Sequence, residues 1–311
     1  MPDQVDPYPA ALPPLVKRAY ARLRRRFRTG APVLSVPALA WTRTLSGGGA
    51  PERYFTHPDA FPMLLLPWWL EGSIRGAPNR RFQAELVYST MSGYYFVRMV
   101  DDLMDGERPP EAAVLPALFV FHTEFVRTYQ GLFGSADRFW DALAATWLDS
   151  AEMASRDSVN GPATRAEFIE TSARKIVAAR IPLAAVCHRH GRTDLLDPWY
   201  RFVDLFGRWH QMLNDISGWQ IDMEHGRLTY FLSRAPNRGR SAVGAWFVTE
   251  GLAGGFAELD GWMDECIAAA SDLGSPPLMA YLASRRDGVA AQRDDMMRSL
   301  QPLLRLASTL R

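Results

Sequence analysis

The segment RMVDDLMDGER places three aspartates, Asp101, Asp102 and Asp105, at the end of an apolar run. The residues that precede it, STMSGYYFV, are typical of a protein interior. Burying an uncompensated carboxylate is costly, so we expect a positive partner for these groups. Acidic side chains are also unfavourable at the carboxyl end of a helix, where the macrodipole is negative. A bound cation therefore explains the cluster better than a solvated helix end does.

A second acidic cluster lies in the segment QMLNDISGWQIDMEHGR. Asn214, Gly218 and Asp222 recur at every fourth position and share one face of a helix, and Asp215 lies seven positions before Asp222. Gly207 extends this face towards the N-terminus, and we expect both glycines to leave open space where a neighbouring helix would otherwise pack. The competing interpretation is a polar stripe on a helix surface.

The two clusters together predict a metal site. If the two helices face each other, their acidic ends form the opposite rims of a mouth above an apolar throat. Oxygen ligands without thiolates or imidazoles suit Mg²⁺, which typically binds through one or two carboxylates and the phosphates of a substrate. The carboxylates would then hold metal, and the metal would hold a diphosphate.

The composition excludes several classes of function. Lys and Arg number 35 and Asp and Glu 34, giving a net charge of +1, so nucleic acid is not expected as the main partner. The proline-rich and basic N-terminal segment, residues 1–30, contains VKRAYARLRRRFR. We interpret this run as a solvated helix face, with an anionic surface or a lid over an anionic ligand as alternatives.

The cysteines and the apolar runs indicate where in the cell the protein is expected. Cys187 and Cys266 are far apart in apolar surroundings, which fits neither a disulfide framework nor a zinc pattern. The N-terminal residues lack the pattern of a secretory signal, and no apolar run approaches the roughly 20 residues that a membrane span needs. These features predict a cytoplasmic protein without a transmembrane segment.

Helical periodicity dominates the chain and predicts one all-α domain over residues 1–311. Residues 29–62 are expected to be irregular, and 228–235 to be either a strand or a continued helix. The expected helices cover residues 14–28, 80–105, 110–133, 135–154, 164–191, 193–226 and 277–308.

The two motifs resemble those of the class I isoprenoid (terpenoid) synthases. Asp101-Asp102-Leu103-Met104-Asp105 matches the first metal motif of that family. The segment from Asn214 to Asp222 is similar to the second motif, Asn-Asp-x-x-Ser/Thr-x-x-x-Glu, with Gly218 in place of the hydroxyl ligand and Asp222 in place of glutamate. Ser217, one position early, or a water is expected to complete the second site. The resemblance covers residues 80–235.

This resemblance implies a helical bundle around an apolar cavity, most like that of a bacterial class I terpene cyclase. The implied activity is ionisation of an allylic prenyl diphosphate of 15 or 20 carbons, cyclisation of the carbocation and release of diphosphate. A cluster of three Mg²⁺ ions, replaceable by Mn²⁺, and a homodimer are also implied. The metal ligands would be Asp101, Asp102, Asp105, Asn214, Asp215, Gly218 and Asp222, and the catalytic residues would be Asp101, Asp105 and Tyr94.

Aromatic and basic residues complete the expected site. Aromatic faces stabilise carbocations, and plain core packing is the alternative for each candidate: Trp68, Trp69, Tyr94, Tyr95, Phe96, Phe206, Trp209 and Trp219. The resemblance assigns diphosphate binding to Arg174, Lys175 and Arg227, with a solvated surface position as the alternative for each. Solvated surface is the expected place of the late arginines Arg285, Arg286 and Arg293, and His210 is expected to be a hydrogen-bonded core histidine.

Other functions stay open at this point. A prenyltransferase, either chain-elongating or of the head-to-head squalene and phytoene synthase type, is the main alternative. Chain-elongating enzymes of the family carry a Gly-Gly-Lys-x-x-Arg-Pro segment and an Arg-Arg pair after the first motif, for which SGGGAPERYF and GERPPEAAV are poor matches. A di-iron carboxylate protein would need paired Glu-x-x-His motifs, which the sequence lacks. A non-catalytic binding subunit is the last alternative.

Overall fold

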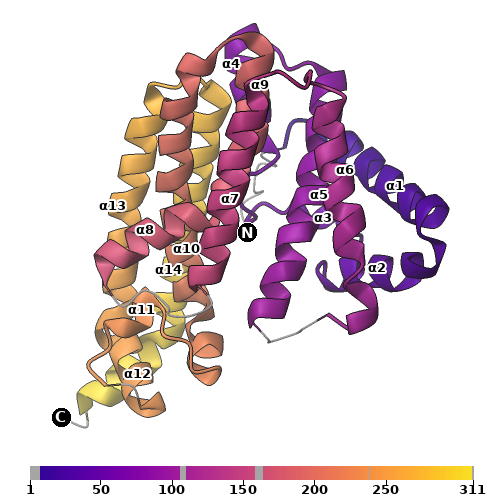
Figure 1. The fold of residues 1–311 in the computed structure, drawn as a ribbon. Coiled ribbons are helices and arrows are strands. Elements are labelled where there is room, and N and C mark those ends of the chain that lie inside the picture. Colours follow the sequence, from indigo (N-terminus) through magenta and orange to yellow (C-terminus); the bar gives the residue numbers. More distant parts are fainter. Residues whose placement is uncertain (1–7, 106–109, 158–163, 238, 310–311) are drawn as a thin grey trace. The chain divides into compact units, whose positions relative to one another are not determined.

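The computed structural model describes residues 8–105, 110–157, 164–237 and 239–309, without the side chains of Asp105, Arg156, Asp157 and residues 301–309. Within these ranges the regular structure is helical and no residue lies in a β-strand (Figure 1), which confirms the predicted all-α class. The chain forms two compact units, Met1–Trp147 with Ala179–Leu196 and Leu148–Ala178 with Asp197–Arg311. One domain over the whole chain stays a prediction.

The first unit carries the first acidic motif. In chain order it contains α1 (Leu12–Gly30), α2 (Pro32–Thr44), α3 (Pro51–Tyr54), α4 (Leu65–Arg75), α5 (Arg80–Asp105), a 3₁₀ turn (Ala112–Val114), α6 (Ala117–Gln130), the first half of α7 (Phe139–Asp157), α9 (Arg180–His190) and a second 3₁₀ turn (Thr193–Leu195).

Helix α5 has the bounds that the sequence predicts, and it packs against α1 and α6. Its apolar face is buried at Leu86, Met91, Tyr95 and Met99. A Cβ on Gly93 would lie 2.9 Å from the ring of Phe125, so this glycine lets α6 approach closely. Buried packing of this kind holds the acidic end of α5 in place.

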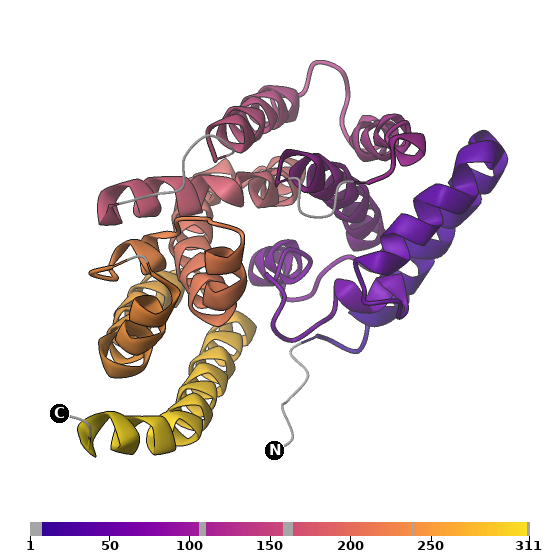
Figure 2. The same cartoon turned by 90° about the horizontal axis from the view of Figure 1, so that it is seen from below.

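Helix α1 confirms the predicted basic helix near residues 14–28. Its buried residues recur every three or four positions, as an amphipathic helix requires: Leu12, Leu15, Val16, Ala19, Tyr20, Leu23 and Phe27. Two of its arginines pair with acids of the neighbouring helices, Arg22 with Glu85 and Arg26 with Glu124, each at 2.7 Å. Helix α1 leads into α2 through Ala31, and both are drawn in indigo in Figures 1 and 2.

The expectation of an irregular stretch over residues 29–62 is wrong, because α2 occupies Pro32–Thr44. Proline suits the first helical turn, where no backbone N–H is needed, so Pro32 starts the helix rather than preventing it. Pro37 lies inside the helix, where Ala38, Leu39 and Trp41 are buried. Tertiary packing of this apolar face outweighs the propensity that the two prolines suggest.

The expected helix over residues 164–191 begins and ends as predicted but is interrupted. Thr164 caps the N-terminus in a capping box with Glu167, and Gly191 ends the segment at φ +63°. In between, α8 (Arg165–Lys175) gives way to a 3₁₀ turn (Val177–Ala179) before α9 starts. Pro182 has no N–H to donate to residue 178, so it fits the first turn of a new helix better than the middle of a long one.

The second unit carries the second acidic cluster. It contains the second half of α7, α8, α10 (Leu196–Glu224), α11 (Tyr230–Ser233), α12 (Arg240–Trp246), a π-helical turn (Phe247–Gly251), α13 (Leu252–Ser271) and α14 (Pro276–Thr309). Residues 228–235, expected to be either a strand or a continued helix, contain the short helix α11. The Thr229 hydroxyl caps it by accepting a hydrogen bond from the Leu232 N–H at 3.2 Å.

The two glycines of the α10 face differ. A Cβ on Gly207 would collide with Ile176, whose Cγ1 would be 2.6 Å away, so this position is closely packed and not open as expected. At Gly218 an added Cβ would lie 3.8 Å from Asp222 Oδ2 of the same helix, an ordinary contact distance, and the described residues place no neighbouring helix against it. Gly207 serves packing within the unit, and Gly218 keeps the acidic end of α10 accessible.

Among the described residues, no helix combines the length and the apolar character needed to cross a bilayer. The cytoplasmic location and the homodimer stay predictions.

Candidate functional site

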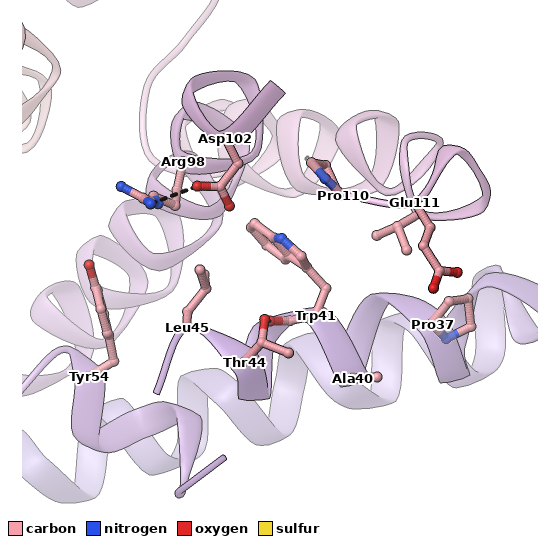
Figure 3. Close-up of a pocket in the computed structure, with 11 residues that line it drawn as sticks. Pro37, Ala40, Trp41, Thr44, Leu45, Tyr54, Arg98, Asp102, Pro110 and Glu111 are labelled. Atoms are coloured by element: carbon pink, nitrogen blue, oxygen red, sulfur yellow. Dashed lines mark hydrogen bonds and ion pairs between the residues drawn. The ribbon is translucent and has the colours of Figure 1, made fainter. Parts of the chain in front are cut away.

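A groove lies beside the acidic end of α5 in the first unit (Figure 3). Its volume is about 590 Å³, within the range of small-molecule sites. Helix α2, α3, the last turns of α5 and the segment after residue 110 contribute its walls. The described lining residues are Pro37, Ala40, Trp41, Thr44, Leu45, Tyr54, Arg98, Asp102, Pro110, Glu111 and Val114.

Asp102 meets its positive partner in this groove. The Arg98 guanidinium lies 2.6 Å from the Asp102 carboxylate, one helical turn away (Figure 3). Asp102 is 7% exposed, so its charge is largely withdrawn from water. Burial lowers the pKa of Arg98 and is the largest single influence on it. The combined effect of its neighbours, led by Asp102, outweighs burial and raises this pKa above its ordinary value. An arginine that precedes an acid by four residues is the less favourable order in a helix. The pair therefore compensates the buried charge of Asp102 more than it stabilises the helix.

Trp41 forms the aromatic centre of the groove, as Figure 3 shows. Its ring lies 5.9 Å from that of Tyr95 and 6.0 Å from that of Phe121, which fixes its orientation. Trp41 and Tyr54 were missed by the sequence analysis because residues 29–62 were expected to be irregular. An unbroken apolar repeat over 33–41 was the signal that could have revealed them.

The charges of the groove are nearly balanced. Of the described lining residues, Arg98 is positive and Asp102 and Glu111 are negative. The Arg98 charge is already engaged by Asp102. A diphosphate carries several negative charges and needs an excess of cations. The described lining therefore suits an apolar or positively charged group better than a diphosphate.

The other aspartates of the first motif lie at the same end of α5. Asp101 is partly exposed, while the side chain of Asp105 lies outside the described residues. Asp101 contributes negative charge around Arg98 and Tyr94, because it raises the pKa of both groups. The metal-binding and catalytic roles of both aspartates stay predictions.

The second cluster also contains an internal ion pair. The Arg227 guanidinium lies 2.9 Å from the Asp222 carboxylate at the end of α10. Asp215 is buried and accepts a hydrogen bond of 2.7 Å from the Gln211 side chain, whereas Asn214 is exposed. This cluster and the first lie in different units. Their expected arrangement on opposite rims of one mouth stays a prediction.

The chemistry of the donors fits Mg²⁺. Asp101, Asp102, Asn214, Asp215 and Asp222 offer oxygen only, which suits a hard cation. In each cluster a carboxylate forms an ion pair with an arginine, which shows that both acidic clusters attract a cation. Among the described residues no group of three or more His, Cys, Asp and Glu side chains is arranged to hold a metal. A site completed by substrate phosphates and water needs fewer protein ligands.

The expected cavity aromatics are largely buried in the core. Trp68 and Trp69 of α4 are 9% and 3% exposed, and Tyr95 is fully buried. Phe206 and Trp209 of α10 stack with ring centroids 5.1 Å apart in the second unit and are at most 1% exposed. Their cavity role stays a prediction, and the groove of the first unit is lined by Trp41 and Tyr54 instead.

Tyr94 lies at the edge of this aromatic cluster. Its hydroxyl shares a hydrogen bond with that of Tyr54, and its ring lies 5.4 Å from that of Phe55. Burial raises the pKa of Tyr94 well above its ordinary value, and the neighbouring Tyr54 raises it further. Tyr94 is therefore a neutral hydrogen-bonding group at physiological pH.

The basic candidates occupy different settings. Arg174 is partly exposed and lies 3.6 Å from Glu170, and Lys175 is exposed at the end of α8. Arg286 pairs with Asp264, and Arg293 lies 3.3 Å from Asp260.

Arg285 and His210 lie closer to the core than the other polar candidates do. Arg285 is only 6% exposed, with its guanidinium 5.3 Å from the centre of the Trp209 ring, so its expected place on the solvated surface is wrong. His210 lies beside Phe206, with ring centroids 6.4 Å apart. Packing of α14 against aromatic residues of α10 withdraws Arg285 from solvent.

Comparison with known proteins identifies the fold. No protein-family model matches the chain, and no curated protein matches it significantly. Among solved structures the chain is similar to the geranylgeranyl pyrophosphate synthetase from the archaeon Geoglobus acetivorans, with a TM-score of 0.61 and 16% sequence identity over 90% of this chain and 98% of that one. At this identity the similarity shows the fold. The chain thus has the all-helical fold of an isoprenoid synthase.

Proposed function

We propose that the protein is a Mg²⁺-dependent class I terpene synthase that ionises an allylic prenyl diphosphate and cyclises the resulting carbocation. The observation that carries the proposal is the complete Asp-Asp-x-x-Asp motif at the end of α5 in an isoprenoid synthase fold. The second motif on α10, with Asn214 and Asp222, supports the same chemistry.

Each part of the proposed site has a distinct role. Bound Mg²⁺ would neutralise the charge that develops on the departing diphosphate. Asp101 and Asp105 would hold metal at the first motif, and Asn214 and Asp222 at the second. Arg174, Lys175 and Arg227 would contact the diphosphate oxygens through charge-assisted hydrogen bonds.

The groove beside Asp102 suits the prenyl chain of the substrate rather than a diphosphate. Its aromatic centre at Trp41 suits the prenyl chain or a carbocation, whose charge the face of an indole ring stabilises. The described lining has no excess of cations to hold a second diphosphate. Cyclisation needs one diphosphate site, whereas chain elongation needs two.

A direct assay tests the proposal. Purified protein is incubated with ten-, fifteen- and twenty-carbon allylic diphosphates, and hydrocarbons and alcohols are identified by gas chromatography with mass spectrometry. We expect cyclic products and released diphosphate with Mg²⁺, neither after chelation, and neither from the Asp101→Ala variant at unchanged helix content. Full activity of Asp101→Ala would contradict the metal assignment.

A prenyltransferase is the second candidate, and the similarity to a protein named geranylgeranyl pyrophosphate synthetase favours it. Isopentenyl diphosphate separates the two functions when it is added to the same incubation. A cyclase forms its product from the allylic substrate alone, and the addition neither lengthens the product nor accelerates its formation. Longer prenyl diphosphates formed only with both substrates would establish the prenyltransferase instead. A head-to-head enzyme would join two allylic molecules.

A further inference from the structure

Positive charge is concentrated at the start of the chain. The whole protein has a net charge of +1, yet residues 7–51 contain eight Lys and Arg residues and no Asp or Glu. Most of this stretch forms α1 and α2 of the first unit. An excess of this kind creates a local positive potential that the overall composition conceals.

Five of these basic residues share one face of α1. At 100° per residue they lie within a third of the helix circumference, opposite the buried apolar face: Lys17, Arg18, Arg24, Arg25 and Arg28. All five are exposed, and none forms an ion pair with any other residue that the structure describes. Arg22 and Arg26, on the flank of this face, are the two that pair with acids of neighbouring helices.

Large apolar side chains are exposed where this face ends. Val33 and Val36, one turn apart in α2, are 92% and 78% exposed. Phe119 of α6 is 77% exposed and lines a hollow of about 170 Å³ together with Gly30, the last residue of α1. The aromatic ring therefore lies beside the junction of α1 and α2. Exposed apolar groups clustered in this way mark an interaction surface.

We propose that this surface docks the protein on an anionic lipid bilayer. The surface, named here the α1–α2 corner, comprises Arg24, Arg25, Arg28, Val33, Val36 and Phe119. Its arginines meet the negative lipid headgroups, while its two valines and phenylalanine enter the boundary between headgroups and acyl chains. The inference does not rest on the proposed function, because charge and exposure alone carry it.

The apolar residues favour lipid over nucleic acid. RNA would engage the arginines through its phosphates, but aliphatic side chains such as Val33 and Val36 offer it no hydrogen bonds and no flat ring for stacking. A bilayer uses both components at the same time, and polybasic helices with adjacent apolar side chains bind membranes by this combination.

Vesicle flotation with the full-length protein tests the inference. One set of vesicles contains phosphatidylcholine only, and the other contains equal parts of phosphatidylcholine and phosphatidylglycerol. We expect binding to the second set at low salt and its loss near 1 M salt, where the screening length falls to about 3 Å. Absence of binding to anionic vesicles, or equal binding to both sets, would overturn the inference.

Two variants separate the electrostatic and apolar contributions. A basic residue near an anionic membrane contributes roughly fivefold in affinity, so Arg24→Gln/Arg25→Gln/Arg28→Gln is expected to bind on the order of a hundredfold more weakly. Val33→Ser/Val36→Ser is expected to lose on the order of tenfold at unchanged net charge. The matched control, Arg75→Gln/Arg80→Gln/Arg81→Gln, removes three exposed charges elsewhere in the first unit and should bind as the unmodified protein does.

One measurement controls for folding, and two others test for a different occupant of the α1–α2 corner. Circular dichroism should show unchanged helix content for all variants, because the substituted side chains are exposed. Sedimentation without vesicles should give the same mass for the protein and for its corner variants. A dimer that only the corner variants dissociate would assign the surface to a second copy of the chain. Binding to single-stranded RNA without binding to vesicles would assign it to nucleic acid.

Discussion

The hydroxyl groups of Tyr54 in α3 and Tyr94 in α5 share a hydrogen bond across 40 residues of sequence. Their rings lie 5.3 Å apart, and Tyr54 lines the groove beside Asp102. This contact ties the wall of the groove to the helix that carries the acidic motif. Residues of this wall can therefore shape a bound prenyl chain without contacting the diphosphate.

Enlarging this wall should change the products more than the rate. We expect Tyr94→Ala to alter the product mixture, because the shape of the wall determines how the carbocation folds, whereas ionisation depends on the charges at the motif. Tyr54→Phe removes only the shared hydrogen bond and serves as the conservative comparison. Product analysis and the rate of diphosphate release are measured together. An unchanged mixture with a greatly reduced release rate would contradict the role of Tyr94 in supporting the wall residue Tyr54.

Removing the positive charge of Arg98 should change the affinities for Mg²⁺ and for diphosphate in opposite directions. In Arg98→Gln, Mg²⁺ alone should bind several-fold more tightly, because it no longer competes with the guanidinium for Asp102. Mg²⁺ that binds Asp102 would release the Arg98 guanidinium, which could then contact a metal-bound diphosphate. Inorganic diphosphate in the presence of Mg²⁺ should therefore bind about tenfold more weakly to the variant, since a charge-assisted contact is worth roughly 1.5–3 kcal/mol. Isothermal titration calorimetry measures both affinities.

The control for this experiment is Arg22→Gln. Arg22 has a similar exposure, 35% against 42% for Arg98, and its partner Glu85 lies outside both acidic motifs. It should change neither affinity. If both affinities fell together in Arg98→Gln, the arginine would only stabilise the fold, and the prediction would be wrong.

A buried carboxylate in α4 should matter for stability. Glu71 is fully buried and accepts hydrogen bonds of 2.9 Å from the Asn79 N–H and the Gln83 side chain, and His190 Nε2 lies at the same distance. Glu71→Ala leaves these groups without their partner and should lower the free energy of unfolding by about 3–5 kcal/mol. Urea denaturation measures the change.

A less severe substitution and an exposed pair provide the comparison. Glu71→Gln keeps an acceptor oxygen and should lose less stability than Glu71→Ala. Glu85→Ala breaks a half-exposed pair with Arg22 and should cost less than about 1 kcal/mol. Equal losses in all three variants would show that the buried network adds nothing beyond an ordinary surface pair.

Much of this architecture could be predicted from the sequence because amphipathic periodicity is a local signal. Helix α5 has the predicted bounds, and Thr164 and Gly191 begin and end the predicted segment. Helix α2 is harder to predict, because Pro37 inside it is a poor helix former and tertiary packing of Trp41 compensates for this proline.

The contacts of the acidic motifs could not be predicted from the sequence, for a different reason. The sequence requires a positive partner for Asp102 but does not say which arginine supplies it, since that depends on burial and side-chain direction. The same holds for Gly207, where Ile176, the turn residue after α8 and 31 positions away in the chain, fills the space. Which residues contact each other depends on the packing of segments distant in the chain, and local sequence patterns do not reveal it.

The two thiols should remain protonated far into the alkaline range. Burial raises the pKa of Cys187 to about 12 and that of Cys266 to about 12, from an ordinary value of 9.0. Because the thiolate is the reactive form, iodoacetamide at pH 8 should modify neither cysteine until the protein is unfolded. Mass spectrometry of native and urea-treated samples checks this, and rapid modification of the native protein would contradict the burial.

These pKa values also fix the sign of a pH effect on stability. A raised pKa means that the folded protein holds its protons more tightly than the unfolded chain does. The corresponding stability is fully present below about pH 9 and is lost as the pH rises towards about 12. A Cys187→Ala/Cys266→Ala variant should show a smaller loss over this range, measured by urea denaturation at each pH.

Diphosphate binding should distinguish Arg174 from an ordinary surface arginine. Arg174 is partly exposed, and its nearest acid, Glu170, lies 3.6 Å away, which is longer than a direct hydrogen bond. Its guanidinium also donates to the Met153 sulfur at 3.6 Å, and a thioether is a weak acceptor that a diphosphate oxygen could replace. Arg174→Gln should weaken the binding of inorganic diphosphate with Mg²⁺ by about tenfold or more.

Arg192→Gln breaks a tight exposed pair with Asp194 at 2.8 Å and should leave this affinity unchanged. If the two variants bound diphosphate equally well, Arg174 would be a surface residue and the remaining charge would have to come from Lys175 and Arg227.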